Sequence, residues 1–168
     1  MALIFLEKSS CPICGSVLKT GQEITGFPPF VSNQADPLML FHDAGFHKDC
    51  VLAHALWPTL DRRITEYHKN TGPGNRACFV CREQIIREDE YFGLGHLTDN
   101  PTSPLYRFNY AYFHRLHLVG WKELPALIRQ LDELDKSGTW KGDGLKWSIK
   151  ELIKIGDSEG TAQNLRSV

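Results

Sequence analysis

The chain has 168 residues, in which 19 lysine and arginine residues stand against 20 aspartate and glutamate residues. This balance excludes binding to nucleic acid or to an anionic membrane through overall charge, so any such binding would have to be local. The apolar run at residues 1–6 has no basic segment before it and is too short for a signal peptide or a membrane span. We therefore expect no membrane partner.

Five cysteine residues are present, and four of them form two Cys-x-x-Cys pairs. The first pair is Cys11 with Cys14, and the second is Cys78 with Cys81. An odd number of cysteines in this spacing is more typical of metal ligands than of the disulfide framework of a secreted protein. We expect a cytoplasmic or otherwise intracellular protein in a reducing compartment.

The sequence matches itself without a gap when it is shifted by 67 residues. The 56 aligned positions of residues 11–66 contain 15 identities, where typical residue frequencies give only about three or four by chance. The self-match predicts two similar units. We predict a zinc-binding repeat over 1–72, a second zinc-binding repeat over 73–138, a helical extension over 139–156 and a flexible tail over 157–168.

Each copy follows one plan in chain order. Residues 11–15 form a tight knuckle, and glycine and proline punctuate residues 16–46, which predicts short strands in a hairpin, one of them at 38–41. A helix is expected over 48–56, and a second helix to about residue 69 has Pro58 in its first turn.

The second copy repeats this plan and leads into the C-terminal region. Pro125 opens an amphipathic helix whose apolar Leu127, Ile128, Leu131 and Leu134 recur at steps of three and four residues. A turn-rich joint over 137–144 precedes one more helix at 145–155. The predicted fold class is small α+β, with two tandem zinc-stapled units, each a knuckle, a β-hairpin and a helix, followed by C-terminal helices.

Each cysteine pair has a second pair of candidate ligands downstream, at the same interval in both copies. Zinc prefers four ligands in a tetrahedron, and residues three apart in a first helical turn share one face, so each downstream pair presents two ligands together. The predicted ligands are Cys11, Cys14, His47 and Cys50 for one zinc ion, and Cys78, Cys81, His114 and His117 for another.

Thiolate and imidazole ligands select zinc over magnesium or calcium, although iron can replace it. Four ligands leave no open position, so both zinc ions are expected to be structural rather than catalytic. The first site has three thiolates and a formal charge of −1, and we expect it to hold metal more tightly than the neutral second site. His54 is the main competitor as a ligand, and redox chemistry at the cysteine pairs is the minor alternative.

The segments Phe46–Cys50 and Phe113–His117 carry a resemblance. A knuckle, a hairpin and then an aromatic residue before His-x-x-Cys or His-x-x-His at a helix start resembles the treble-clef zinc fold used by LIM, RING, PHD and HNH proteins. The resemblance implies a zinc fold and no particular function. In RING and LIM proteins the second and third ligand pairs are close together, whereas 27 residues separate Cys50 from Cys78, so each zinc is expected to belong to its own repeat.

Three functions fit this pattern. The leading hypothesis is a non-enzymatic module that binds a protein partner, as an adaptor or as an inhibitor or immunity-type protein, without a small-molecule substrate. The second is nucleic-acid binding through a local basic excess and a set of aromatic side chains that could stack on bases. The third is an HNH-like nuclease using His42 and Asp43, or Asn109. The basic residues are Lys48, Arg62, Arg63, Lys69, Arg76, Arg82 and Arg87, and the aromatic residues are Tyr106, Phe108, Tyr110, Tyr112 and Phe113.

Overall fold

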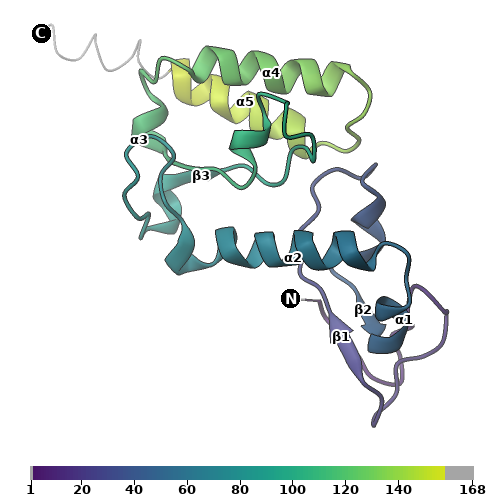
Figure 1. Ribbon diagram of the computed structural model, residues 1–168. Coiled ribbons are helices and arrows are strands. Elements are labelled where there is room, and N and C mark those ends of the chain that lie inside the picture. The colour runs from purple at the N-terminus through teal and green to yellow at the C-terminus, as the bar shows by residue number, and fades with distance from the viewer. Residues whose placement is uncertain (1, 158–168) are drawn as a thin grey trace, which may run out of the picture. The chain divides into compact units, whose positions relative to one another are not determined.

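The computed structural model describes residues 2–157, and the chain divides into two compact units (Figure 1). The first unit contains the chain up to Val31 together with Asp36–His68. The second contains the short segment Ser32–Ala35 and the chain from Lys69 onward. Each unit is therefore described by itself.

In the first unit, strand β1 (Ile24–Gly26) pairs antiparallel with β2 (Gly45–His47), so that the predicted hairpin is confirmed. A 3-10 helix, η1 (Pro37–Phe41), lies in the connection between the two strands. Helix α1 (Lys48–Leu52) follows β2 directly, and the longer α2 (Trp57–Thr71) comes next. Strand β2 and helix α1 hold two of the candidate ligands of this unit, His47 and Cys50, and the other two, Cys11 and Cys14, lie in a turn before β1.

The second unit is built from a second antiparallel pair of strands and a larger helical part. Strand β3 pairs with β4, and α3 follows β4 directly. Helices α4 and α5 pack side by side (Figure 1), and α3 packs against α5. The elements are η2 (Pro73–Asn75), η3 (Glu88–Glu90), β3 (Tyr91–Gly93), η4 (Tyr106–Phe108), β4 (Tyr112–His114), α3 (Arg115–Leu118), α4 (Leu124–Lys136) and α5 (Gly144–Asp157).

Corresponding elements of the two units begin 67 residues apart. Strand β1 begins at Ile24 and β3 at Tyr91, and β2 begins at Gly45 and β4 at Tyr112. Less common backbone conformations follow the same offset. The pairs of residues with positive φ are Gly15 (φ 73°) with Arg82 (φ 68°), and Asp43 (φ 49°) with Tyr110 (φ 56°).

Each unit has its own apolar core. In the first unit the rings of Phe27, Phe41 and Phe46 pack within about 6 Å of one another, centroid to centroid, around the hairpin. In the second unit Phe113 of β4 is buried with Leu127 and Leu131 of α4, as the predicted amphipathic pattern requires. A β-strand ligand is therefore anchored in both units by a buried phenylalanine next to it.

The strand predicted at residues 38–41 is wrong. Residues 38–41 are a 3-10 helix and not a strand, because Pro37 restricts its own φ and the Asp36 carboxylate accepts the N–H of Leu38 as a cap. Tyr110 has a left-handed φ, so the run of aromatic residues before β4 is not one continuous strand.

The helix predicted over 48–56 ends earlier, at Leu52. His54 explains the early end, because its Nδ1 accepts the N–H of Leu56 at 3.2 Å and competes with a helical hydrogen bond. The predicted last helix is confirmed as α5, and residues 158–168, in the predicted tail, lie outside the described residues.

The segment Ser32–Ala35 is held by the joint before α5. The side-chain amide of Asn33 donates to the carbonyl of Thr139 at 3.1 Å and accepts the N–H of Lys141 at 2.9 Å. The N–H of Gln34 donates to the carbonyl of Lys141 at 3.0 Å. No local sequence pattern predicts this connection, since it joins residues more than 100 positions apart.

Candidate metal centres

The first ligand cluster combines Cys11, Cys14, His47 and Cys50, and its ligand atoms all lie within 4.8 Å of one another. The two cysteines sit in a turn closed by a hydrogen bond from the N–H of Gly15 to the carbonyl of Cys11, 2.8 Å long. His47 ends β2 and Cys50 lies in the first turn of α1. The strand-to-helix junction thus presents two ligands toward the cysteine turn.

The second cluster combines Cys78, Cys81, His114 and His117 in the same way. Its turn is closed by the N–H of Arg82, which donates to the carbonyl of Cys78 at 2.8 Å. The N–H of His114 also points at the Cys78 sulfur, 3.3 Å away. Both predicted ligand sets are therefore brought together by the fold, and each group could hold a metal ion.

The distances between ligand atoms fit a tetrahedral site. Bond lengths of about 2.3 Å to sulfur and 2.0–2.1 Å to nitrogen give tetrahedron edges of about 3.6 Å from S to N and about 3.3 Å from N to N. In the first cluster Nδ1 of His47 lies 3.4 Å from Sγ of Cys14 and 3.9 Å from Sγ of Cys50.

In the second cluster the fit is closer. Sγ of Cys78 lies 3.6 Å from Nδ1 of His117, and Sγ of Cys81 lies 3.6 Å from Nδ1 of His114. The two Nδ1 atoms are 3.3 Å apart. All three histidines offer Nδ1, so the donor set and its spacing suit one tetrahedral cation in each cluster.

Gln22 supports the first cluster from outside it. Its side-chain oxygen lies 3.1 Å from Nε2 of His47, which places the ring proton on Nε2 and leaves the Nδ1 lone pair free for a metal ion. The sequence does not predict this role of Gln22, because the second copy has Asp89 at the corresponding position and the repeat therefore does not mark Gln22 as a shared residue. Asp89 pairs with Arg87 instead, with 2.9 Å between the charged atoms.

Neighbouring groups favour thiolates at two ligands of the first cluster. Burial raises the pKa of Cys11, but hydrogen bonds from the backbone N–H groups of Cys14 and His47 outweigh it and the pKa is lowered. Hydrogen bonds from the backbone and side chain of Ser16 lower the pKa of Cys14 to about 6. Burial and the two neighbouring thiols raise the pKa of Cys50 to about 11. Without a cation, the cluster thus accommodates fewer than three negative charges.

The second cluster shows the same division between its two cysteines. Burial raises the pKa of Cys78, but hydrogen bonds from the N–H groups of Cys81 and His114 outweigh it and lower the pKa to about 6. A backbone hydrogen bond at Glu83 lowers the pKa of Cys81. Burial and the adjacent Cys78 raise this pKa by more, so that it lies above the usual value. A dication in the cluster would remove this conflict, because it would stabilise both thiolates.

The remaining histidines of interest make other contacts. His54 is outside the cluster: besides its hydrogen bond to Leu56, its ring packs edge-on against Phe41 at 5.2 Å. Nδ1 of His42 accepts the N–H of Val31 at 3.1 Å. The competing ligand assignment for His54 therefore finds no support in the described residues.

His42 and Asn109 occupy corresponding positions and close corresponding loops. Oδ1 of Asn109 accepts the N–H groups of Leu97 and Thr98 at 2.8 and 3.1 Å, and its amide donates to the carbonyl of Thr98. Two residues considered for a nuclease site thus share one structural task, the closure of a loop between the strands.

Most of the basic stretch is neutralised or buried. The Arg63 side chain is 1% exposed and pairs with Asp36 at 3.0 Å. On the surface, Lys48 pairs with Glu23 and Arg62 with Glu66. Among the aromatic residues proposed for stacking, Phe108, Tyr110 and Phe113 are buried. These contacts reduce the basic and aromatic surface that is available to nucleic acid, whereas Lys69, Arg82 and Tyr106 remain exposed.

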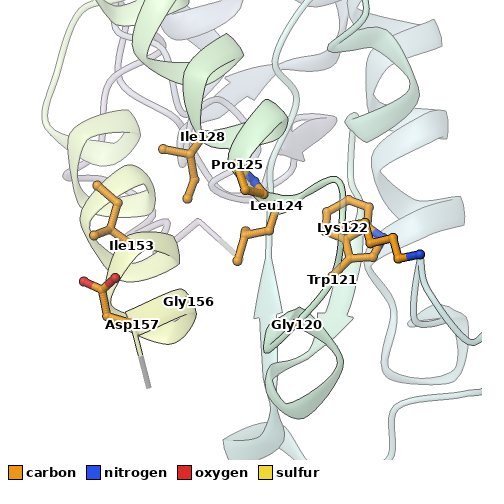
Figure 2. Close-up of a pocket in the computed structure, with 9 residues that line it drawn as sticks. All are labelled: Gly120, Trp121, Lys122, Leu124, Pro125, Ile128, Ile153, Gly156 and Asp157. Atoms are coloured by element: carbon orange, nitrogen blue, oxygen red, sulfur yellow. The ribbon is translucent and has the colours of Figure 1, made fainter. Parts of the chain in front are cut away.

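A pocket of about 510 Å³ lies between α4, α5 and the loop before α4 (Figure 2). Ile128 of α4 and Ile153 of α5 line it together with Trp121, and Lys122 and Asp157 are its charged residues. None of the eight ligands lines this pocket.

Within residues 2–157, no helix is long and apolar enough to cross a membrane.

No protein-family model, curated protein or solved structure matches this chain.

Proposed function

We propose that the protein binds two zinc ions, one in each cluster, and uses the stapled units to bind a protein partner without catalysing a reaction. The zinc assignment is supported by sulfur and imidazole donors at tetrahedral spacing, a set that zinc prefers and that magnesium and calcium do not. The numbers of thiolates, three and two, are also typical of structural zinc.

The structural role is supported by the number of ligands. Each cluster supplies four side chains from a rigid turn and a strand-to-helix junction, so a bound zinc ion would have no open position for water or substrate. We do not propose a nuclease, because His42 and Asn109 are engaged in loop closure.

The partner-binding role is carried by one observation at the second cluster. Leu116 lies on α3, and in the sequence it stands between the candidate ligands His114 and His117. It is 83% exposed. It lines a surface hollow of about 480 Å³ together with Val80 and Val119. The neighbouring metal ligands thus hold the exposed Leu116 beside an apolar hollow. An exposed leucine next to a hollow suits contact with an apolar side chain of a protein partner.

The zinc assignment is tested by elemental analysis of the purified protein and of the variants Cys11→Ser and Cys78→Ser. We expect about two zinc ions per chain, and each variant should lose about one and unfold at a lower temperature. One zinc ion or none in the unmodified protein would overturn the assignment.

The partner role is tested by affinity capture with three baits: the unmodified protein, Leu116→Asp and, as a matched control, Ile86→Asp. Both side chains are highly exposed, but Ile86 does not line the hollow. A protein captured by the unmodified bait and by Ile86→Asp, but lost with Leu116→Asp at unchanged zinc content, would support the role. Identical captures with all three baits would contradict it.

A further inference from the structure

A polar pocket of about 220 Å³ lies beside the cysteine turn of the second unit. Arg82 and Arg107 are its charged lining residues, and no carboxylate lines it. The polar residues Asn70, Asn75 and Asn109 belong to the same lining. Positive charge and polar residues thus surround a space that is large enough for a small anion.

The guanidinium groups of Arg82 and Arg107 both lie close to the ring of Phe79. The guanidinium carbon of Arg82 lies 4.9 Å from the ring centroid, and that of Arg107 lies 5.9 Å from it. Arg107 also forms an exposed ion pair with Glu123. Arg82 has no carboxylate partner among the ion pairs within residues 2–157, so its charge remains available to a ligand.

The backbone at Arg82 is strained. Its φ of 68° is left-handed, a conformation that is unfavourable for a residue other than glycine. The first unit has Gly15 at the corresponding position with nearly the same φ of 73°. An arginine that is kept in a conformation suited to glycine indicates a use for its side chain.

The pocket residues are also specific to the second unit. Where it has Phe79 and Arg107, the corresponding positions of the first unit hold Pro12 and Leu40. The shared zinc-binding plan therefore does not need these side chains, since the first cluster forms without them.

We propose that this pocket binds a phosphoryl group carried on a side chain of the protein partner. Two guanidinium groups and nearby amides match the charge and the several acceptor oxygens of a phosphate monoester. A nucleic-acid strand is disfavoured, because only two arginines line the pocket and Arg87, the next arginine along the chain after Arg82, is paired with Asp89 and Glu90. This inference rests on the partner-binding function proposed above.

The first measurement is a titration with inorganic phosphate, followed by amide NMR shifts of the zinc-loaded protein. Sulfate and chloride at the same ionic strength are the controls. Saturable shifts near residues 75–82 and 107–112 are expected with phosphate. Their absence, or equal shifts with chloride, would overturn the pocket.

The second measurement compares a degenerate pool of phosphoserine peptides with the same peptides without phosphate and with a single-stranded oligonucleotide. Arg82→Gly, which keeps the residue type of the first unit, and Arg107→Gln should each weaken phosphopeptide binding about tenfold or more. Arg129→Gln, an exposed arginine on α4, is the matched control and should leave it unchanged.

Zinc content of every variant is measured in parallel, so that a lost metal site is not mistaken for a lost arginine. Binding of the oligonucleotide but not of the phosphopeptides, with the same arginine dependence, would overturn the proposed source of the phosphate. If a partner is still captured through Leu116 while the phosphate titration shifts no amide signals, the phosphate pocket is overturned and the partner-binding function is not.

Discussion

The Nδ1 atoms of His114 and His117 lie 3.3 Å apart, with their rings nearly perpendicular at 85°. Two imidazole lone pairs at this distance repel each other unless a proton or a cation lies between them. The thiolate-prone Cys78 lies 3.6 Å from Nδ1 of His117, which makes a cation the better match.

This arrangement predicts opposite outcomes for two substitutions at His117. His117→Ala should lose about one zinc ion per chain. His117→Cys should keep both and hold the second more tightly against a competing chelator, because it reproduces the three-thiolate set that Cys50 completes in the first cluster. Zinc transfer to a chromophoric chelator measures both, and full zinc content in His117→Ala would contradict the assignment.

Acidification should release the metal from both clusters. The pKa of Cys14 and that of Cys78 are each lowered to about 6. A lowered folded-state pKa means that these thiolates contribute stability fully above the unfolded-state pKa of about 9, and that this contribution is lost as the pH falls through about 6. Zinc release should therefore steepen near and below pH 6. The raised pKa values of Cys50 and Cys81 mean that zinc displaces protons from these two thiols at higher pH as well.

The measurement is zinc release into a metal-sensitive dye, recorded together with the unfolding temperature between pH 8 and pH 4. The two signals should fall together. Release that is complete at pH 7.5, where both thiols remain ionised on this account, would show that their environment is not the one described.

How much of this site the sequence predicts depends on the kind of signal. The two clusters of four cysteine and histidine side chains were predictable, because zinc chemistry favours these residue types and the repeat copies their spacing. Gln22 was not, since a supporting hydrogen bond needs only one amide and leaves no repeated pattern.

The 3-10 helix at 37–41 was mistaken for a strand because a short apolar run has no period long enough to separate the two. A proline at its start and the Asp36 cap were the local signals that favoured a helical turn. The place of Ser32–Ala35 in the second unit depends on hydrogen bonds to residues 139–141, and such distant pairing has no local signal at all.

The left-handed residue after each cysteine turn leads to a further prediction. Gly15→Ala should destabilise the protein by about 1–2 kcal/mol, since alanine pays the left-handed penalty that glycine avoids. A Cβ at this position meets no atom within 4 Å, so the cost is conformational rather than steric.

Arg82→Ala is the matched comparison, because Arg82 already has a left-handed φ and the substitution adds no conformational strain. It should change stability by less than about 1 kcal/mol, through loss of the exposed contact with Phe79. Chemical denaturation with saturating zinc measures both variants, and equal effects of the two substitutions would contradict the shared turn geometry.

Two adjacent arginines in α2 should differ sharply in their effect on stability. Arg63 is 1% exposed and pairs with Asp36, which is 13% exposed and caps the 3-10 helix. Arg62 is about half exposed and pairs with Glu66 one turn away. Removing one partner of a buried pair leaves a charge without compensation, whereas an exposed pair contributes little.

Arg63→Ala should therefore lower the free energy of unfolding by about 3–5 kcal/mol, and Arg62→Ala by about 0.5 kcal/mol or less. Denaturation of the zinc-loaded variants, with a double-mutant cycle that adds Asp36→Asn, isolates the interaction between Arg63 and Asp36. If Arg62→Ala were as damaging as Arg63→Ala, or if the cycle gave no coupling, the buried pair would not stabilise the first unit. A large and specific effect at Arg63 would also mean that this arginine, although it lies in the basic stretch, serves the fold rather than a nucleic-acid surface.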